Sequence, residues 1–355
     1  MKRAFAIADR AALPALALMA ALNLLFLVSF VVVALMATGK AHAAEAAACT
    51  GTDLLASLKQ SDPALFDQIR AEADATPNGK GLLWKIEKKG EAPSFLFGTM
   101  HMTDPRVVAL TPAARQAFDA AGTVVIETTD ILDPNGMMAA ILRDPELTMF
   151  TDDTTLTSLL SPQDTELVRE ALDKRGIPLA SVAKMKPWML SAMVALPACE
   201  MARKAGGAPM LDIKLAEDAR AAGKSLEGLE TIADQLGAMA SLPMAFHMEG
   251  LVETLKLGDR IDDVIETMIL LYGRGETGMI WPLFHAVLPG GEGDQGYADF
   301  EETMVTARNR LMAERAAPIL AGGNVFIAVG ALHLPGSEGL VELLRQRGYV
   351  MTAVN

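Results

Sequence analysis

Two similar segments, far apart in the chain, constrain its fold more than any other feature of the sequence. One reads SFLFGTMH and ends at His101; the other reads VFIAVGALH and ends at His333. Each begins with an apolar run typical of a buried parallel strand, stops at Gly98 or Gly330, and places a histidine three residues later. The loop that leaves the carboxyl end of such a strand is where α/β proteins carry functional groups. The sequence therefore predicts an α/β fold with two histidines at a sheet edge.

Each GxxH segment is followed by a helix and another strand, so residues 94–127 and 325–353 form two similar strand–GxxH–helix–strand units. They predict a mixed, largely parallel sheet, to which residues 82–86 add a strand joined to 95–97 by a polar turn. Between the units, residues 133–318 are mainly helical, with one short strand expected at 226–230. We expect residues 44–355 to form a single domain, with helices near 54–73, 111–121, 166–175, 185–201, 213–222, 232–240, 298–320 and 337–347.

The two units also predict where a functional site lies. Because the strands of a βαβ unit are parallel, their carboxyl ends share one edge. Glu127 closes the strand that follows His101, so the two side chains should face one cleft, joined by His333 if the second unit enters the same sheet. Two imidazoles and one carboxylate suit a hydrolytic metal site with a position left for water. Gly98 and Gly330 let the backbone turn away without a Cβ in the way.

A simpler interpretation stays open, because short motifs match by chance. In it, both glycines only terminate strands and both histidines are ordinary loop residues. No other catalytic motif competes, since GxSxG, HExxH and phosphate-loop sequences do not occur. His247 and His285 lie in helical, apolar surroundings and are expected to be structural, and residues 289–297 are expected to form a glycine-rich loop.

The N-terminus has the pattern of an export signal. Basic residues precede an uncharged apolar stretch at 11–39, and Ala41-His42-Ala43 matches a signal peptidase site. Because the stretch is long enough to cross a bilayer, a retained membrane anchor is the alternative. We expect export to the periplasm or another extracytoplasmic compartment, with residues 1–43 as signal peptide or anchor.

The charge balance narrows the choice of partners. The chain has 31 basic and 44 acidic residues, and removing residues 1–43 takes away four basic residues and one acidic residue. The remaining net charge of −16 argues against binding to nucleic acid or to anionic lipid, which require clustered Lys and Arg. Contact with a membrane is expected only through an uncleaved N-terminal segment. The sequence does not indicate an oligomeric state.

Cys49 and Cys199 are the two cysteines of the chain. In an exported protein, an even number of cysteines suggests a disulfide, which here would tie the start of the mature chain to its middle. Lipidation of Cys49 is the alternative, although the preceding residues make a poor lipobox.

Several motifs together resemble those of a known family. LFGTMHMTDPRV at residues 96–107 resembles the first motif of the TraB/PrgY/GumN family, to which the animal Tiki proteins are related. VVIE, ending at Glu127, resembles the strand that follows it. Further landmarks occur in the family's order, and the resemblance spans residues 82–353. They are Lys186-Pro187-Trp188, Gly228-Leu229-Glu230-Thr231 with Gln235, Arg308-Asn309, and the closing residues 329–349.

The resemblance implies a chemistry that spacing alone does not. Tiki-type members are metal-dependent peptidases that act through the two GxxH histidines and favour manganese or cobalt over zinc. Relatives with the same fold are thought to include erythromycin esterases and haem-binding ChaN-like proteins. Carried over, His101, Glu127 and His333 are metal ligands, or one of them acts as a base. Arg308 is a candidate oxyanion stabiliser, and Glu230 and Asn309 are candidates for supporting the ligands.

The leading hypothesis is therefore an exported metal-dependent hydrolase, which the family resemblance makes a peptidase with a peptide or protein substrate. An envelope protein that binds a peptide or a haem-like ligand in the same cleft without catalysis is the alternative, motivated by the methionine-rich helical region. Met185, Met189 and Met193 recur there at helical spacing, which is more typical of core packing. A scaffold without activity is the third possibility.

Overall fold

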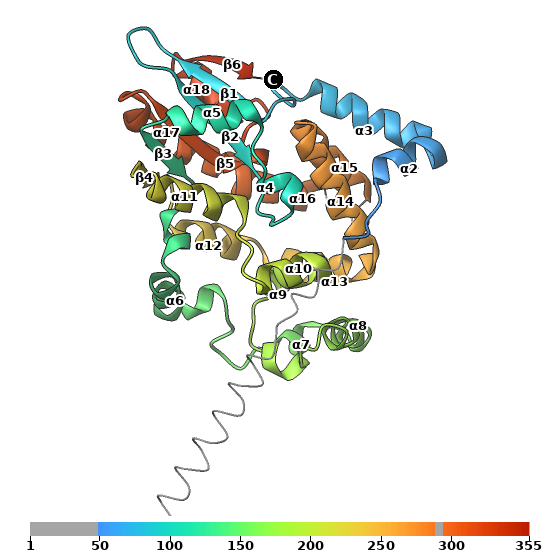
Figure 1. Ribbon diagram of the computed structural model, residues 1–355. Coiled ribbons are helices and arrows are strands. Elements are labelled where there is room, and N and C mark those ends of the chain that lie inside the picture. The colour runs from blue at the N-terminus through green and yellow to red at the C-terminus, as the bar shows by residue number, and fades with distance from the viewer. Residues whose placement is uncertain (1–48, 288–293, 355) are drawn as a thin grey trace, which may run out of the picture. The chain divides into compact units, whose positions relative to one another are not determined.

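The computed structural model describes residues 49–287 and 294–354, and its centre is a six-stranded sheet in the order β4-β3-β5-β2-β1-β6 (Figure 1). Neighbouring strands from β4 to β2 are parallel, whereas β1 is antiparallel to both β2 and β6. The predicted mixed, largely parallel sheet is confirmed. The strands are β1 (Leu83–Glu87), β2 (Ser94–Thr99), β3 (Thr123–Ile126), β4 (Ser225–Gly228), β5 (Val325–Gly330) and β6 (Val350–Val354).

The two strand–GxxH–helix–strand units interleave instead of lying side by side. Strand β5 of the second unit lies between β2 and β3 of the first, so that Ala328 pairs with Phe97 on one side and with Ile126 on the other. Strand β6 reaches the far edge of the sheet, next to β1. As a result, the carboxyl ends of β2, β5 and β3 are neighbours.

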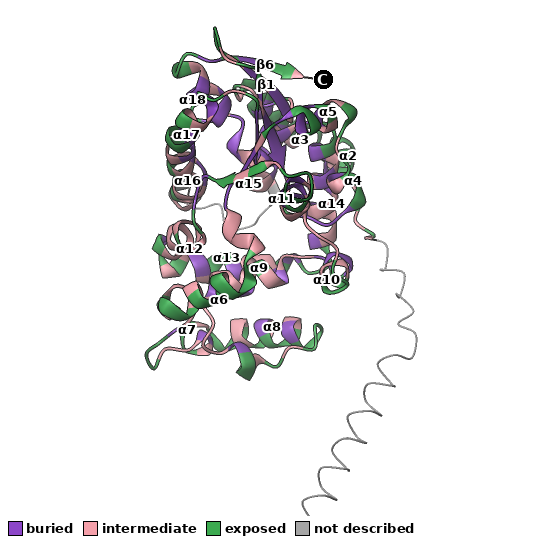
Figure 2. Ribbon diagram, turned by 60° about the vertical axis from the view of Figure 1, so that its left-hand side comes forward, coloured by how far each residue is buried: buried purple, intermediate pink, exposed green. Residues whose placement is uncertain are grey.

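Helices cover both faces of the sheet, and alternate residues of a strand enter different cores. Phe326 packs with Phe118 of α5 (Pro112–Ala120) and Leu215 of α11 (Leu211–Ala221). Ile327 packs with Met312 of α17 (Ala307–Leu320). Residues of β5 are therefore buried on both sides, as its unbroken apolar sequence requires. Figure 2 shows these buried strands enclosed by helices that are exposed on their outer sides.

Prolines divide two of the helices expected from the sequence. Asp62 caps α3 and Pro63 occupies its first turn, so the helix expected at 54–73 is two helices; Pro197 likewise precedes α10. The helix expected at 298–320 contains a π-helical segment at Glu302–Thr306, which ends two residues before Arg308. The helices are α2 (Leu54–Ser61), α3 (Pro63–Ala75), α4 (Pro105–Val108), α5 (Pro112–Ala120), α6 (Pro134–Arg143), α7 (Leu156–Leu159), α8 (Pro162–Asp173), α9 (Pro187–Val194), α10 (Ala198–Ala205), α11 (Leu211–Ala221), α12 (Ile232–Ser241), α13 (Met244–Leu257), α14 (Arg260–Gly273), α15 (Ile280–Val287), α16 (Asp294–Glu301), α17 (Ala307–Leu320) and α18 (Leu340–Gln346), with short 3₁₀ turns at Thr129–Leu132, Pro145–Leu147, Leu179–Val182, Thr277–Met279 and Ala331–His333.

The helical middle of the chain has a core of its own. Leucine and valine side chains of α7, α8, α9 and α13 form one buried cluster, and Met185 and Met193 pack against it. These two methionines are partly buried and serve in core packing, as their spacing favours. His247 of α13 is also buried, and its Nε2 lies 3.0 Å from the Met239 carbonyl oxygen, in agreement with a structural role.

Two expectations concern segments at the limits of the described residues. The expected export signal at 1–43 lies outside them, and no helix within the described ranges is both long and apolar enough to cross a membrane. Residues 294–297 belong to α16, so the expected loop at 289–297 is wrong for its last four residues. The rest of that loop is outside the described residues.

Candidate functional site

The sheet brings the three residues of the predicted site to one edge. His101 follows β2, Glu127 follows β3 directly, and His333 ends the 3₁₀ turn Ala331–His333 that follows β5. Thr99 pairs with Gly330 and Ile126 with Ala328, so the three strands end close together. Their ionisable side chains interact electrostatically with one another.

Glu127 is a buried carboxylate, and both of its oxygens accept hydrogen bonds. Its Oε1 accepts a hydrogen bond of 2.6 Å from the Gly330 N–H, and its Oε2 accepts from Arg308 at 2.7 Å and from Gln235 at 3.0 Å. Burial alone raises the pKa of Glu127, but His333, His101, Arg308 and the Gly330 hydrogen bond outweigh it and lower this pKa to about 2. Glu127 is therefore ionised at neutral pH.

His333 is buried and its tautomer is determined by Asn309. Its Nδ1 lies 2.7 Å from Oδ1 of Asn309, while Nδ2 of that amide donates to the Glu338 carbonyl at 2.9 Å. Because the amide oxygen only accepts, Nδ1 of His333 carries the proton and Nε2 has the free lone pair. Burial lowers the pKa of His333 to about 4, so the ring is neutral at pH 7.

His101 differs from His333 because its side chain is 58% exposed. Its Nδ1 lies 2.8 Å from Oδ2 of Asp212, a buried residue of α11 whose Oδ1 accepts from the Thr99 hydroxyl at 2.5 Å. The negative charge of Asp212 raises the pKa of His101 to about 9, against the effect of desolvation. At pH 7 both nitrogens of the His101 ring are therefore protonated. Because Asp212 holds Nδ1, a metal ion would bind at Nε2 by displacing the proton there.

Arg308 joins two buried carboxylates. Its Nη2 donates to Oε2 of Glu127 and to Oε2 of Glu230, both at 2.7 Å, and its Nε donates to Oε1 of Glu230 at 2.9 Å. Nη1 donates to the Met304 carbonyl oxygen at 3.1 Å. Most of the guanidinium donors are therefore used inside the protein, and in this arrangement Arg308 holds Glu127 in place and in its ionised form.

The donor chemistry of these residues fits a divalent cation, although the arrangement is not a closed metal site. Nε2 of His333 and Oε1 of Glu127 are 3.8 Å apart, a separation that one ion at about 2.1 Å from each donor can span. Within residues 49–287 and 294–354, however, no three His, Cys, Asp or Glu side chains lie close enough together to hold a metal ion. His101 is the predicted ligand at the exposed side of the cluster.

The two motif glycines are required for space, and not for an unusual backbone conformation. Gly330 has a φ of −50°, which any residue adopts. A Cβ on Gly98 would lie 3.0 Å from Cα of Ala331, and a Cβ on Gly330 would lie 3.1 Å from Oε1 of Glu127. Glycine at these positions therefore lets the turn after β5 and the Glu127 carboxylate approach the strand ends.

Comparison with known proteins agrees with this geometry. The model of the TraB/PrgY/gumN family matches residues 82–353, a range that includes both GxxH segments, Arg308, strands β1 to β5 and all but the last residue of β6. The chain belongs to the TraB/PrgY/gumN family. The predicted relationship to the Tiki proteins is confirmed as well, because the relatives found are named as such.

These relatives of the TraB/PrgY/gumN chain are animal proteins. The chain is 23% identical to metalloprotease TIKI2 of Danio rerio over 315 residues, which cover 75% of this chain and 60% of the relative. It is 24% identical to metalloprotease TIKI1 of Danio rerio over 313 residues, covering 75% and 62%. The chain thus spans about three-fifths of the length of these relatives. No solved structure shows significant similarity to it.

Two residues of the site were not among those predicted from the sequence. Gln235 belongs to a landmark of the TraB/PrgY/gumN resemblance, and that landmark is the signal that could have identified it. Asp212 is separated from His101 by 111 residues and lies in the first turn of an ordinary amphipathic helix. Nothing in the sequence of that helix distinguishes Asp212 from a solvated acidic residue.

Proposed function

We propose that this protein is an exported metal-dependent hydrolase that cleaves peptide or protein substrates. One observation carries the proposal: Asp212 and Asn309 hold the Nδ1 atoms of both GxxH histidines at one sheet edge, so Nε2 of each ring is the nitrogen left for a metal ion. Nε2 of His333 lies 3.8 Å from Oε1 of the ionised Glu127. Such orientation by a second residue is typical of histidines that bind metals. Similarity to proteins named metalloproteases supports the same reaction class and a peptide substrate.

His101, Glu127 and His333 are the residues that would hold the ion. From the family resemblance we propose manganese or cobalt in preference to zinc. A bound divalent ion supplies Lewis acidity, which polarises the scissile carbonyl and acidifies a water molecule.

The protein's own residues have distinct tasks in this proposal. Glu127, whose pKa is about 2, is a weak base at neutral pH and is better suited to binding a cation than to accepting a proton. Arg308 and the Gly330 N–H fix the direction of its two oxygens. Asn309 keeps the proton of His333 on Nδ1. Asp212 accepts the Nδ1–H of the exposed His101 ring, whose Nε2 would lose its proton to solvent when an ion binds.

A disulfide bond supports the proposed export. Cys49 and Cys199 form a disulfide with Cα atoms 5.4 Å apart, so the predicted bridge is confirmed. Structural disulfides persist in oxidising compartments and are rare in the cytosol. Together with the signal-like N-terminus, this supports a periplasmic or other extracytoplasmic location.

The test is turnover of a peptide library by the purified protein with added Mn²⁺ or Co²⁺, read by mass spectrometry. We expect cleavage that EDTA abolishes and that His101→Ala/His333→Ala lacks. His247→Ala is the matched control, because it removes a buried histidine outside the cluster; it should retain cleavage. Cleavage by the double variant at the wild-type rate would rule the site out.

A further inference from the structure

The backbone just after His101 is held by a buried carboxylate of another helix. We call Glu200 and the two hydrogen bonds that it accepts from Thr103 the clamp. Glu200 of α10 has a fully buried side chain. Its Oε1 accepts from the Thr103 N–H and its Oε2 from the Thr103 hydroxyl, both at 2.8 Å. Two hydrogen bonds to one residue define both the position and the orientation of that residue, which lies only two positions beyond His101.

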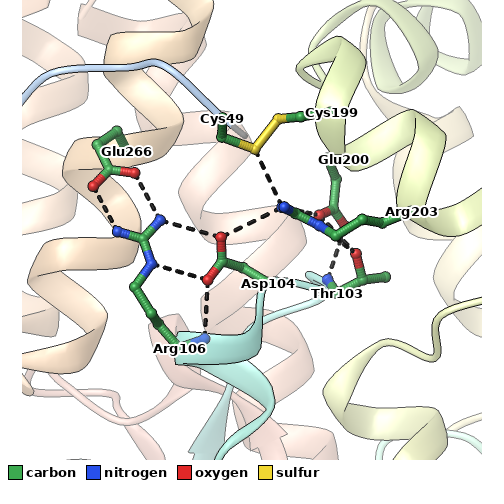
Figure 3. Close-up of a disulfide and its surroundings, with 8 residues drawn as sticks. All are labelled: Cys49, Thr103, Asp104, Arg106, Cys199, Glu200, Arg203 and Glu266. Atoms are coloured by element: carbon green, nitrogen blue, oxygen red, sulfur yellow. Dashed lines mark hydrogen bonds and ion pairs between the residues drawn. A yellow bond between two sulfur atoms is a disulfide. The ribbon is translucent and has the colours of Figure 1, made fainter. Parts of the chain in front are cut away.

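Arg203 completes this clamp and joins it to the disulfide (Figure 3). Its Nη2 donates to Oε2 of Glu200 at 3.0 Å and to Sγ of Cys49 at 3.2 Å, and its Nε donates to the Thr103 hydroxyl at 3.2 Å. Arg203 thus balances the charge of Glu200. Because Cys199 precedes Glu200 directly in α10, the disulfide also ties this helix to the start of the described chain.

A second set of hydrogen bonds holds the loop that carries His101 further along the chain, at Asp104 and Arg106. Asp104 accepts hydrogen bonds from the backbone N–H and side chain of Arg106, whose guanidinium forms two bonds of 2.7 and 2.8 Å to Glu266 of α14. The His101 side chain, in contrast, is largely exposed and has a single hydrogen-bonded partner among the described residues, Asp212. The position of its ring therefore depends strongly on where the backbone of the loop is held.

We propose that Glu200 is a positioning residue for His101, and that Arg203 and the Cys49–Cys199 disulfide support it. The inference rests on the proposed function, since it assigns to this clamp the placing of one ligand of the ion. Loss of the clamp frees the loop that carries His101. It leaves the hydrogen bonds of His333 and Glu127 in place, because among the described residues none of their hydrogen-bonded partners belongs to α10. Changes to groups that orient metal ligands typically weaken metal affinity by about 10- to 100-fold.

Two variants of the exported, purified protein test the clamp: Glu200→Gln, which keeps the shape of the side chain, and Thr103→Val, which removes the hydroxyl. Each should weaken binding of Mn²⁺ or Co²⁺ by about tenfold or more by titration calorimetry. Each should also speed amide hydrogen exchange in residues 100–108 without metal. Thr148→Val is the matched control, because Thr148 is buried and its hydroxyl donates to the Pro145 carbonyl oxygen within the helical middle of the chain. It should change neither quantity.

A variant that leaves Glu200 in place keeps the test decisive if Glu200→Gln does not fold. Cys49→Ser/Cys199→Ser should produce faster exchange in residues 100–108 and weaker metal binding, both in the same direction as Thr103→Val. If the wild type binds metal and all folded variants bind it equally well with unchanged exchange, the positioning role is refuted. If the wild type binds no metal but exchange still responds, the clamp stands and the metal-dependent function fails.

Discussion

Replacing Arg308 with methionine is expected to destabilise the protein strongly, because Arg308 is the cation shared by two buried carboxylates. Its Nη2 lies 2.7 Å from Oε2 of Glu127 and from Oε2 of Glu230, and the Glu230 side chain is fully buried. Removing one partner of a buried ion pair leaves an uncompensated charge and costs about 3–5 kcal/mol. We expect a loss of this size in the free energy of unfolding.

Urea unfolding of the purified protein at pH 7 with EDTA measures this loss. Arg310→Met is a matched control, because Arg310 pairs with Glu302 and Glu338 at the surface, where such pairs contribute about 0–1 kcal/mol. In a Glu230→Gln background the cost of Arg308→Met should fall by about 1–3 kcal/mol, since the two residues are in contact. A loss no larger than that of Arg310→Met would refute the account of a shared buried cation.

Three further predictions concern acid, the disulfide and the motif glycine. Because burial lowers the pKa of His333 from 6.5 to about 4, the unfolded chain takes up this proton first. Without metal, the free energy of unfolding should fall with decreasing pH between pH 6.5 and pH 5, more steeply in the wild type than in His333→Gln by about 1 kcal/mol per pH unit. Equal slopes in the two proteins would contradict this. Cys49→Ser/Cys199→Ser should cost about 2–5 kcal/mol in urea unfolding, since the bridge closes a loop of 150 residues, and an unchanged midpoint would contradict this. Gly98→Ala should lower the free energy of unfolding by about 1–3 kcal/mol, because its Cβ would lie 3.0 Å from the Ala331–His333 turn. Gly237→Ala, whose Cβ would have no neighbour within 4 Å, should not lower it in the same assay.

Features encoded locally could be predicted from the sequence. The helix starting at Pro112 follows from Thr111, whose side chain accepts from the Ala114 N–H, and from proline in the first turn. The unbroken apolar run of β5 indicates a strand buried on both faces, and it is one. Both GxxH histidines and Glu127 could be assigned to one sheet edge, because parallel strands share that edge whatever their order.

Features that depend on distant contacts could not be predicted. Nothing in β5 specifies that it lies between β2 and β3, because its apolar residues suit any central position in a parallel sheet. Asp212 and Glu200 are indistinguishable in the sequence from solvated acidic residues of helices, yet both are buried and hold the loop of His101. Their roles arise only when α10 and α11 pack beside that loop.

The metal content of the purified protein tests the central claim most directly. It is measured by elemental mass spectrometry after exposure to Mn²⁺ or Co²⁺ and removal of unbound ion. The His101→Ala/His333→Ala variant is measured in the same way for comparison. The account predicts about one divalent ion per chain in the wild type and none in the double variant. A wild type without bound metal, or equal metal in both proteins, would contradict it.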